Sequence, residues 1–401
     1  MKRIKLAVVS HALVQEVVHK RWRLLAQKFP VEVTLIVPKV WRARWLVDEF
    51  VFRPRSVEEE HFRVLPLPTT TTRYWGKYFF CSRDMGFKSL SPDVIYTIQE
   101  ELLWVHQQVI RCRNAWAPDA RMLFFSMNAL GVPQQRWDQQ WRWRWVKENY
   151  DAALGHYPGC LKSLREAGFK KPVFLQTQVG IDEALYEPDE SRRQEMRVRL
   201  GLHGRFVVGY AGRLTRDKGL DVLMASLSML SGNWALLLLG NGDYRLEIER
   251  MVQKRGWQDR VMLAGTVDQR EVADYLRAMD CFVIGSRTRP GWIDTFPNAL
   301  VQAMACGVAV VGSDSGAIPY IIQDAGIVVP EGDVEKTAEA IQHCLDDGGQ
   351  RISYGQKARA RAVVEFGAEA LAQHFYGILQ QVTSGNYRTG LDDHHQEKAW
   401  M

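Results

Sequence analysis

Two basic residues five positions apart follow an apolar run in the middle of the chain. The run 206–210 predicts a buried strand, which ends in a glycine turn before Arg213 and Lys218. Gly219 then precedes an amphipathic stretch, 220–230, that predicts a helix. Backbone N–H groups and the positive end of a helix attract anions, while Arg supplies a fork of donors and Lys a point charge. The pattern is suited to holding a diphosphate, although an ordinary loop with two solvated cations would contain the same residues.

Two further loops follow predicted strands in the same half of the chain. Gly240 and Asn241 form a glycine-rich turn at the end of the run 234–240, where the backbone can approach a ligand closely. Val267 ends the run 261–267 just before a predicted helix and can present backbone groups to a nucleobase.

The loop 286–298 leads into a predicted helix over 299–306. Pro297 is expected in the first turn of that helix, with Thr295 or Phe296 near the cap. The free N–H groups at such a helix start would point at a phosphate.

Strand and helix patterns alternate almost from end to end, and the strands are apolar throughout. This predicts an α/β protein with parallel sheets covered on both faces, built as two Rossmann-like doubly wound domains. Such sheets bind ligands at the carboxyl ends of their strands, which is where the loops above are expected. The predicted strands are 4–10, 31–38, 64–68, 94–98, 121–127, 152–156, 173–179, 206–212, 234–240, 261–267, 281–286, 309–313 and 326–330.

A charged stretch with a proline at 180–205 has the composition of a linker and marks a domain boundary. We expect a first domain over 1–180 and a second domain over 181–365. A C-terminal helix over 366–382 is expected to pack on the first domain, and the polar tail 383–401 to be disordered.

Composition narrows the class of partner. The net charge of +6 suits anionic small molecules or an acidic membrane surface, but it is too small and too scattered for a nucleic-acid binder. Six scattered cysteines without a C-x-x-C pair indicate reduced thiols. The N-terminal apolar stretch is too short for a signal peptide and no run approaches 18 apolar residues, so a cytoplasmic protein is expected.

Four segments, in this order and spacing, resemble the retaining, nucleotide-sugar-dependent glycosyltransferases of group 1 (family 4). They are Gly-Arg-Leu-x-x-x-Lys-Gly at 212–219, the stretch 294–302, Ala-Met-Ala-Cys-Gly at 303–307 and Gly-Ser-Asp-Ser-Gly-Ala-Ile-Pro at 312–319. Gly-Ile-Asp at 180–182 also matches the family's domain junction. The resemblance covers most of the chain and implies the GT-B fold, in which two Rossmann-like domains face each other across a cleft.

In that family, the Arg and Lys of the first loop hold the donor diphosphate, a role that falls here on Arg213 and Lys218. Two family glutamates eight positions apart meet the donor sugar and the ribose, and this chain has Asp294 and Gln302 instead. The shorter Asp294 withdraws its carboxylate by about 1.5 Å. A neutral Gln302 gives about 0.5–1.5 kcal/mol where a charged group gives about 1.5–3 kcal/mol, which predicts roughly tenfold weaker nucleotide binding.

Each of these two residues has a plain alternative. Asp294 could be a carboxylate that favours a helix N-terminus, and Gln302 a polar helix residue facing solvent. The resemblance implies Arg213, Lys218 and Asp294 as catalytic residues. The implied nucleotide-sugar site consists of Gly212, Gly240, Asn241, Val267, Thr295, Phe296, Pro297, Asn298, Ala299 and Gln302.

The resemblance further implies transfer with retention, in which the leaving diphosphate takes the proton of the acceptor hydroxyl. The protein would then mainly stabilise charge on the diphosphate, and neither a metal nor another cofactor is expected. The sequence has no HxH, HExxH or DxD element, in keeping with a metal-independent reaction. The donor would be a UDP- or GDP-sugar and the acceptor a glycan or a lipid-linked molecule.

The sequence indicates the residues that would bind the acceptor less clearly. His11, Glu100 and Asn128 follow predicted first-domain strands and could orient an acceptor hydroxyl, although ordinary cap or surface roles fit them as well. His156, at another strand end, is expected to be a core or rim histidine.

Ten of the fourteen tryptophans precede residue 150, and many are interleaved with Arg and Lys, above all at 136–147. Such a surface suits an anionic membrane headgroup layer or sugar stacking. Because Trp137, Trp141 and Trp145 share one helix face, a buried stripe is the alternative.

The leading hypothesis is a retaining glycosyltransferase in the assembly of a cell-surface polysaccharide or glycoconjugate. A nucleotide-sugar 2-epimerase on the same fold, or a degenerate protein that binds a nucleotide sugar without catalysis, remains an alternative.

Overall fold

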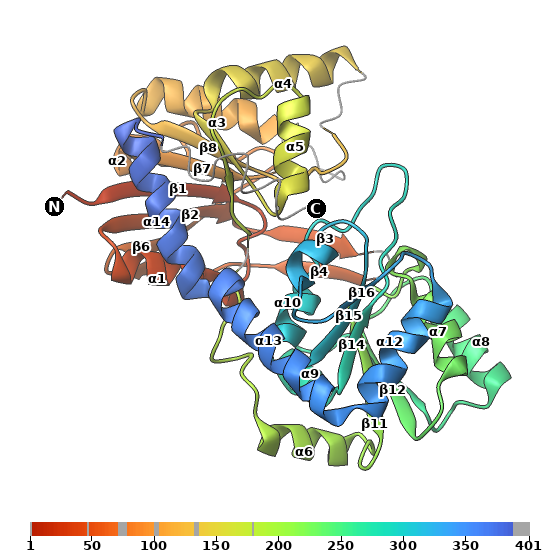
Figure 1. The fold of residues 1–401 in the computed structure, drawn as a ribbon. Helices are drawn as coiled ribbons and strands as arrows, with labels where there is room; N and C mark the ends of the chain where they lie inside the picture. The colour runs from red at the N-terminus through yellow and green to blue at the C-terminus, as the bar shows by residue number, and fades with distance from the viewer. Residues whose placement is uncertain are drawn as a thin grey trace. The chain divides into compact units, whose positions relative to one another are not determined.

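The computed structural model describes residues 2–45, 48–70, 78–99, 104–131, 136–178 and 180–387, with side chains outside 43–50 (Figure 1). The chain divides into two compact units. The first contains 2–44, 49–180 and the chain from 368 onward, and the second contains 181–367 together with Trp45 and Asp48. The domain boundaries predicted from the sequence lie after residues 180 and 365.

The first unit is built on an eight-stranded sheet in the order β10-β9-β8-β7-β1-β2-β6-β5. All its pairs are parallel except β5 with β6. A separate two-stranded sheet is formed by β3 and β4. The bounds are β1 Ile4–Ser10, β2 Val31–Pro38, β3 Trp41–Trp45, β4 Asp48–Phe52, β5 Val57–Glu59, β6 Phe62–Leu67, β7 Val94–Ile98, β8 Arg121–Ser126, β9 Ala152–Gly155 and β10 Val173–Leu175.

Helices cover both faces of this sheet, as its continuously apolar strands require. They are the 3₁₀ turn η1 Glu16–His19, α1 Lys20–Lys28, α2 Phe87–Leu90, α3 Trp104–Trp116, α4 Trp137–Asn149, α5 Pro158–Glu166 and α14 Ala368–Ser384.

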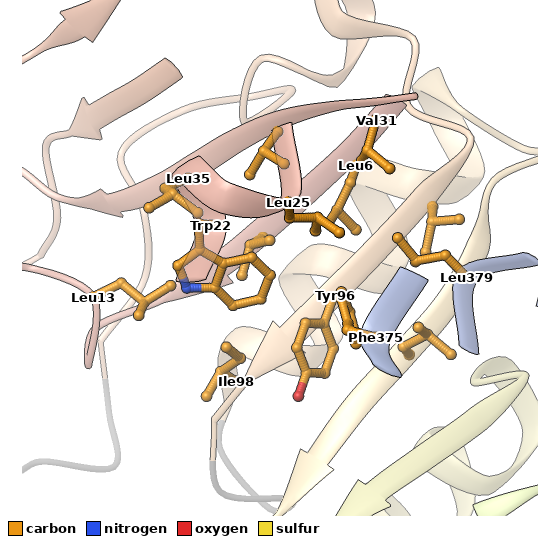
Figure 2. Close-up of a cluster of buried hydrophobic side chains, with 14 of the residues drawn as sticks. Leu6, Leu13, Trp22, Leu25, Val31, Leu35, Tyr96, Ile98, Phe375 and Leu379 are labelled. Carbon is orange, nitrogen blue, oxygen red and sulfur yellow. The ribbon is translucent and has the colours of Figure 1, made fainter. Parts of the chain in front are cut away.

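The last helix, α14, returns to the first unit and lies beside α1 (Figure 1). Figure 2 shows the core that they share, in which Trp22 of α1 meets Phe375 of α14 edge to face with 5.6 Å between ring centroids. Tyr96 of β7 packs against the same Phe375 ring at 5.2 Å. The C-terminal helix therefore completes the core of the first unit.

On the opposite face of the sheet, α3 and α4 supply a second core. Trp143 and Val146 are the buried residues of α4. Trp137 is 79% exposed, and Trp141 is also exposed. The buried stripe considered for Trp137, Trp141 and Trp145 is therefore wrong, because α4 turns the Trp143 side inward.

The second unit contains a six-stranded parallel sheet in the order β13-β12-β11-β14-β15-β16. The strand order reverses between β11 and β14, which makes the carboxyl ends of these two strands the expected ligand-binding edge. The strand bounds are β11 Phe206–Ala211, β12 Trp234–Leu239, β13 Val261–Gly265, β14 Cys281–Ile284, β15 Ala309–Ser313 and β16 Ile327–Val329.

Its helices are α6 Glu190–Arg199, η2 Arg216–Lys218, α7 Leu220–Ser226, η3 Leu227–Met229, α8 Arg245–Arg255, α9 Val272–Arg277, α10 Asn298–Ala305, α11 Ile318–Ile322, α12 Val334–Asp346 and α13 Gly348–Phe366.

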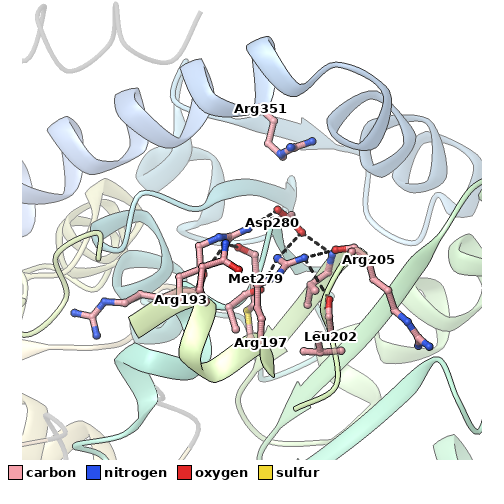
Figure 3. A network of polar contacts seen from close by, with 12 residues as sticks. Arg193, Arg197, Leu202, Arg205, Met279, Asp280 and Arg351 are labelled. Carbon is pink, nitrogen blue, oxygen red and sulfur yellow. Dashed lines mark hydrogen bonds and ion pairs between the residues drawn. The ribbon is translucent and has the colours of Figure 1, made fainter. Parts of the chain in front are cut away.

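The stretch 180–205 is more than a linker, because it contains α6 and that helix is fixed to the second sheet (Figure 3). Asp280, just before β14, accepts hydrogen bonds from Arg193 at 2.6 Å and from Arg197 at 3.0 Å. The oxygen of Asp280 that accepts from Arg197 also accepts from the backbone N–H of Val207 at 2.7 Å. Some of the charged side chains that gave this stretch the composition of a linker therefore form ion pairs with Asp280.

Candidate functional site

The loops after β11 and β14 meet at the edge where the strand order reverses. The backbone N–H of Arg287 donates to the carbonyl of Asp217 at 2.9 Å. Gly219 has φ +69°, and a Cβ there would lie 1.9 Å from the carbonyl oxygen of Gly285. Glycine is therefore required at 219, because any side chain would push the two loops apart.

Lys218 and Asp294, 76 positions apart in the chain, form a buried ion pair between these loops. Lys218 Nζ lies 2.5 Å from Asp294 Oδ2, and the hydroxyl of Ser286 donates to the same oxygen at 2.7 Å. The Lys218 ammonium also lies 4.9 Å from the centroid of the Trp292 ring. Asp294 is only 7% exposed. The structure thus joins two of the three residues expected to be catalytic and fixes the carboxylate from two sides.

Arg213, the third residue, is held differently. Its carbonyl accepts a hydrogen bond from the Tyr210 hydroxyl at 2.8 Å, which fixes the backbone of the loop. Its guanidinium is 3.9 Å from Asp217, and the side chain is partly exposed. Among the described residues this long ion pair is the only charged contact of Arg213, so its fork of donors is available to an anion.

The glycine turns after β11 and β12 are packed backbone to backbone. A Cβ on Gly240, which has φ +120°, would lie 1.9 Å from the carbonyl oxygen of Gly212. The Leu214 N–H donates to the Asn241 carbonyl at 3.0 Å. Val267 lies two positions after the end of β13 and is half-buried. These four predicted positions, Gly212, Gly240, Asn241 and Val267, therefore continue the same sheet edge away from β14.

The helix α10 begins one residue earlier than expected. Asn298 is its first residue and Pro297 is the N-cap, with extended ψ of 96°, so the prediction that Pro297 lies in the first turn is wrong. Phe296 is buried and its ring centroid lies 5.6 Å from that of Phe366, while Thr295 and Ala299 are half-buried and Asn298 is exposed. Phe296 therefore anchors the start of α10 in the core.

Gln302 is engaged by a residue that the sequence did not single out. Its amide N–H donates to the Tyr186 hydroxyl at 2.9 Å. Tyr186 is buried, and burial raises the pKa of its hydroxyl far above the ordinary value, so it stays neutral. The alternative that Gln302 only faces solvent is wrong, because the side chain is half-buried and hydrogen-bonded.

Sequence reasoning also missed Glu331, which follows β16 at the same edge. Its carboxylate accepts from the N–H of Thr288 at 2.8 Å and from the Thr288 hydroxyl at 2.5 Å. Burial raises the pKa of Glu331, but hydrogen bonds from Thr288 and Ser315, together with the Arg287 charge, outweigh it and keep the pKa below the ordinary value. The sequence could have indicated this residue, because Glu331 follows an apolar strand just as Gly240 and Val267 do.

The predicted acceptor residues of the first unit lie at strand ends. His11 follows β1, and its Nδ1 is 2.5 Å from the side-chain oxygen of Gln99, whose amide donates to the Tyr78 hydroxyl at 2.6 Å. Burial lowers the pKa of His11, which favours the neutral ring. Asn128 is half-buried after β8, and Glu100 lies outside the described residues.

His156 is a core residue, as expected. Its ring meets Phe125 edge to face at 4.6 Å, and burial lowers the pKa of His156 to about 3.

Among the described residues, no group of three or more His, Cys, Asp and Glu side chains could hold a metal ion. Over the same part of the chain, none of the helices combines the length and the apolar composition needed to span a bilayer.

Residues 192–361 match the sequence model of the family Glycosyl transferases group 1. A GDP-mannose-dependent monoacylated α-(1-6)-phosphatidylinositol monomannoside mannosyltransferase of Corynebacterium glutamicum is 28% identical over 228 residues, 55% of this chain and 59% of that protein. The lipopolysaccharide core biosynthesis glycosyltransferase LpsE of Rhizobium meliloti is 24% identical over 74% of this chain and 84% of its own. The chain thus spans little more than half the length of the mannosyltransferase.

Solved structures show the same fold. A sucrose-phosphate synthase from Thermosynechococcus elongatus superposes with a TM-score of 0.72 at 22% identity, covering 96% of this chain and all of that chain. Anabaena HepE in complex with UDP superposes with a TM-score of 0.68 at 16% identity, over 95% of this chain and all of that one. The group 1 resemblance and the fold class of two Rossmann-like domains are both confirmed.

Proposed function

We propose that the protein is a retaining glycosyltransferase, because residues 192–361 match the sequence model of the group 1 glycosyltransferases. It transfers a sugar from a nucleoside diphosphate donor, a UDP- or GDP-sugar, to a glycan or lipid-linked acceptor. The observation that carries the proposal is the buried Lys218–Asp294 pair and the partly exposed Arg213, at the strand-order reversal of the second sheet.

In the proposed reaction, Arg213 and Lys218 hold the donor diphosphate. Lys218 is already positioned by Asp294 and Trp292, so little ordering is needed when the anion arrives. The hydrogen bonds to the Asp294 carboxylate from described residues fall on Oδ2, which leaves Oδ1 to accept a hydrogen bond from a donor sugar hydroxyl.

The bond changes balance without a further group. The acceptor oxygen forms a bond to the anomeric carbon on the face that the diphosphate leaves, and the departing phosphate oxygen takes the acceptor proton. Negative charge grows on the diphosphate, where the Arg213 and Lys218 cations stabilise it most in the transition state. We therefore propose a metal-independent reaction.

Calorimetric titration with UDP- and GDP-sugars, followed by donor hydrolysis and transfer assays, tests the proposal. Replacing Arg213 or Lys218 by Ala should cost more than roughly tenfold in activity. Arg216→Ala is the matched control, because this arginine lies on the same turn but is largely exposed. No binding of either nucleotide sugar would overturn the proposal, as would equal losses in all three variants.

One observation favours a second candidate, a protein that binds the nucleotide sugar without catalysis. Gln302, which replaces the family's ribose-binding carboxylate, already donates to Tyr186. Nucleotide-sugar binding with neither hydrolysis nor transfer to any acceptor would support this candidate.

We also propose peripheral contact with an anionic membrane at the cytoplasmic face, consistent with a lipid-linked acceptor. The support is the outer side of α4, where Trp137 and Trp141 are exposed next to Arg136 and Arg144. Aromatic and basic side chains together suit a headgroup layer. Sedimentation with anionic liposomes at low salt is expected, and Trp137→Ala should weaken it. Failure of the protein to sediment would refute this contact.

A further inference from the structure

A pocket of about 430 Å³ lies in the first unit between α3 and the segment 79–83, and the donor site does not use it. Its size falls in the range of about 300–1,000 Å³ that small-molecule sites occupy. The lining combines aromatic rings, amides and guanidinium groups from Phe79, Ser82, Arg83, Trp104, Gln107, Gln108, Arg111 and Cys112.

Gln107 is the unusual member of this lining. The residue is 2% exposed, and among the described residues neither its amide nitrogen nor its side-chain oxygen has a hydrogen-bond partner. The amide offers two donors and one acceptor, and leaving them unmet in a protein interior is costly. A buried amide of this kind that lines a cavity needs a polar group there to bond with.

The pocket walls are fixed by hydrogen bonds that do not involve Gln107. Gln108, the next residue on α3, accepts from the Phe80 N–H at 2.9 Å and donates to the Phe80 carbonyl at 2.7 Å. The Cys112 thiol donates to the Arg83 carbonyl at 3.4 Å. The segment 79–83 is therefore held to α3 with the cavity between them, which spares a ligand the cost of ordering it.

Basic side chains line this pocket, and the Asp84 carboxylate accepts a hydrogen bond from the hydroxyl of the lining residue Ser82 at 3.3 Å. Arg83 and Arg111 line it, and neither pairs with a carboxylate among the described residues. Arg111 has its guanidinium 5.8 Å from the Trp145 ring centroid, a contact that leaves its N–H fork available. Two guanidinium groups that form no ion pair with a described carboxylate favour a phosphate or a carboxylate.

The aromatic lining adds a surface for a ring. Phe79 is exposed at the pocket, and Trp104 is backed by the Arg142 guanidinium at 5.0 Å, which Asp138 holds in place. The electron-rich face of an aromatic ring suits the C–H face of a pyranose, and an amide such as Gln107 can bond neighbouring hydroxyls.

We propose that this pocket binds an anionic sugar unit, a pyranose ring that carries a phosphate or a carboxylate. The anion lies between Arg83 and Arg111, a ring hydroxyl meets Gln107, and the sugar face packs on Trp104 or Phe79. This site is separate from the donor site of the second unit, so its failure would leave the transferase proposal intact.

Calorimetric titration of the full chain with glucose 6-phosphate, glucuronate, glucose and inorganic phosphate tests the proposal. At least one of the two acidic sugars should bind tenfold or more tighter than both glucose and inorganic phosphate. Gln107→Leu and Arg111→Ala should each weaken that binding at least tenfold, and Arg144→Ala, an exposed arginine on α4, should not.

Gln107→Leu also separates a binding role from a structural one. Leucine removes an unpaired amide, so the melting temperature should stay level or rise while affinity falls. The proposal is overturned if neither acidic sugar binds, if inorganic phosphate binds equally well, or if Gln107→Leu leaves the affinity unchanged. An equal effect of Arg144→Ala would likewise overturn it, because the binding would then reflect general charge.

Discussion

Replacing Lys218 by Met separates the two roles that the structure gives to its ammonium. The side chain is 12% exposed, so its loss leaves the Asp294 carboxylate buried with only the Ser286 hydroxyl among its described partners. Removing one partner of a buried ion pair costs about 3–5 kcal/mol. The retained hydrogen bond offsets part of this, and we expect a loss of about 3 kcal/mol in the stability of the second unit.

For a domain of 150–250 residues, about 3 kcal/mol corresponds to a fall of roughly 6–12 °C in melting temperature. The double variant Lys218→Met/Asp294→Asn should recover most of this loss, because it buries no unpaired charge. Activity should behave differently. Loss of a cation that stabilises developing charge costs about 10²–10³ in kcat, and the double variant should not restore it.

Thermal melts and donor hydrolysis, measured on the single and double variants, give both readouts. The reasoning would be refuted by a Lys218→Met protein that loses stability yet hydrolyses donor within threefold of wild type. It would be refuted equally by a double variant in which stability and activity return together.

Three other predictions concern stability, affinity and pH. Asp280→Ala leaves two arginines of α6 without their carboxylate partner and should lower the melting temperature by several degrees. The control Asp268→Ala, at an exposed carboxylate, should change the melting temperature little. Equal shifts in the two variants would show that the Asp280 network does not stabilise the fold. Gln302→Glu should tighten nucleotide binding about tenfold in calorimetry if this position meets the ribose, and unchanged affinity would place the ribose elsewhere. Because burial lowers the pKa of His156 to about 3, the unfolded chain takes up this proton at a higher pH than the folded chain does, and the free energy of unfolding should fall as pH drops below about 6.5. Urea unfolding at several pH values should show a weaker dependence of this free energy on pH in His156→Phe than in wild type. An unchanged pH dependence would contradict this assignment.

Most of the fold could be predicted because the central parallel strands are buried on both faces and are therefore apolar along their whole length. The strands that the sequence did not reveal lack that signature. The two-stranded sheet β3–β4 and the short β5 are rich in charged residues and lie outside the parallel core. The buried face of α4 could not be predicted either, because tryptophans occupy several of its faces and only packing in the fold selects Trp143.

The site was partly predictable for a related reason. Parallel strands bring their carboxyl ends to one edge, so Lys218 and Asp294 could be assigned to one place although 76 positions separate them. Pairing with specific partners was not predictable. Tyr186 lies in a stretch with linker composition, 116 positions from Gln302, and nothing local ties the two together. Gln107 similarly has no sequence signal, because its significance comes from a cavity that only the packing of α3 creates.

The central claim is that Arg213 and Lys218 hold the diphosphate of a nucleotide sugar. The most direct measurement compares the affinities of UDP with UMP, and of GDP with GMP, in wild type and in Arg213→Ala/Lys218→Ala. We predict that, for one base, the diphosphate binds wild type at least tenfold tighter than the monophosphate. In the double variant this ratio should fall toward one. A ratio that the double substitution leaves unchanged would contradict the account.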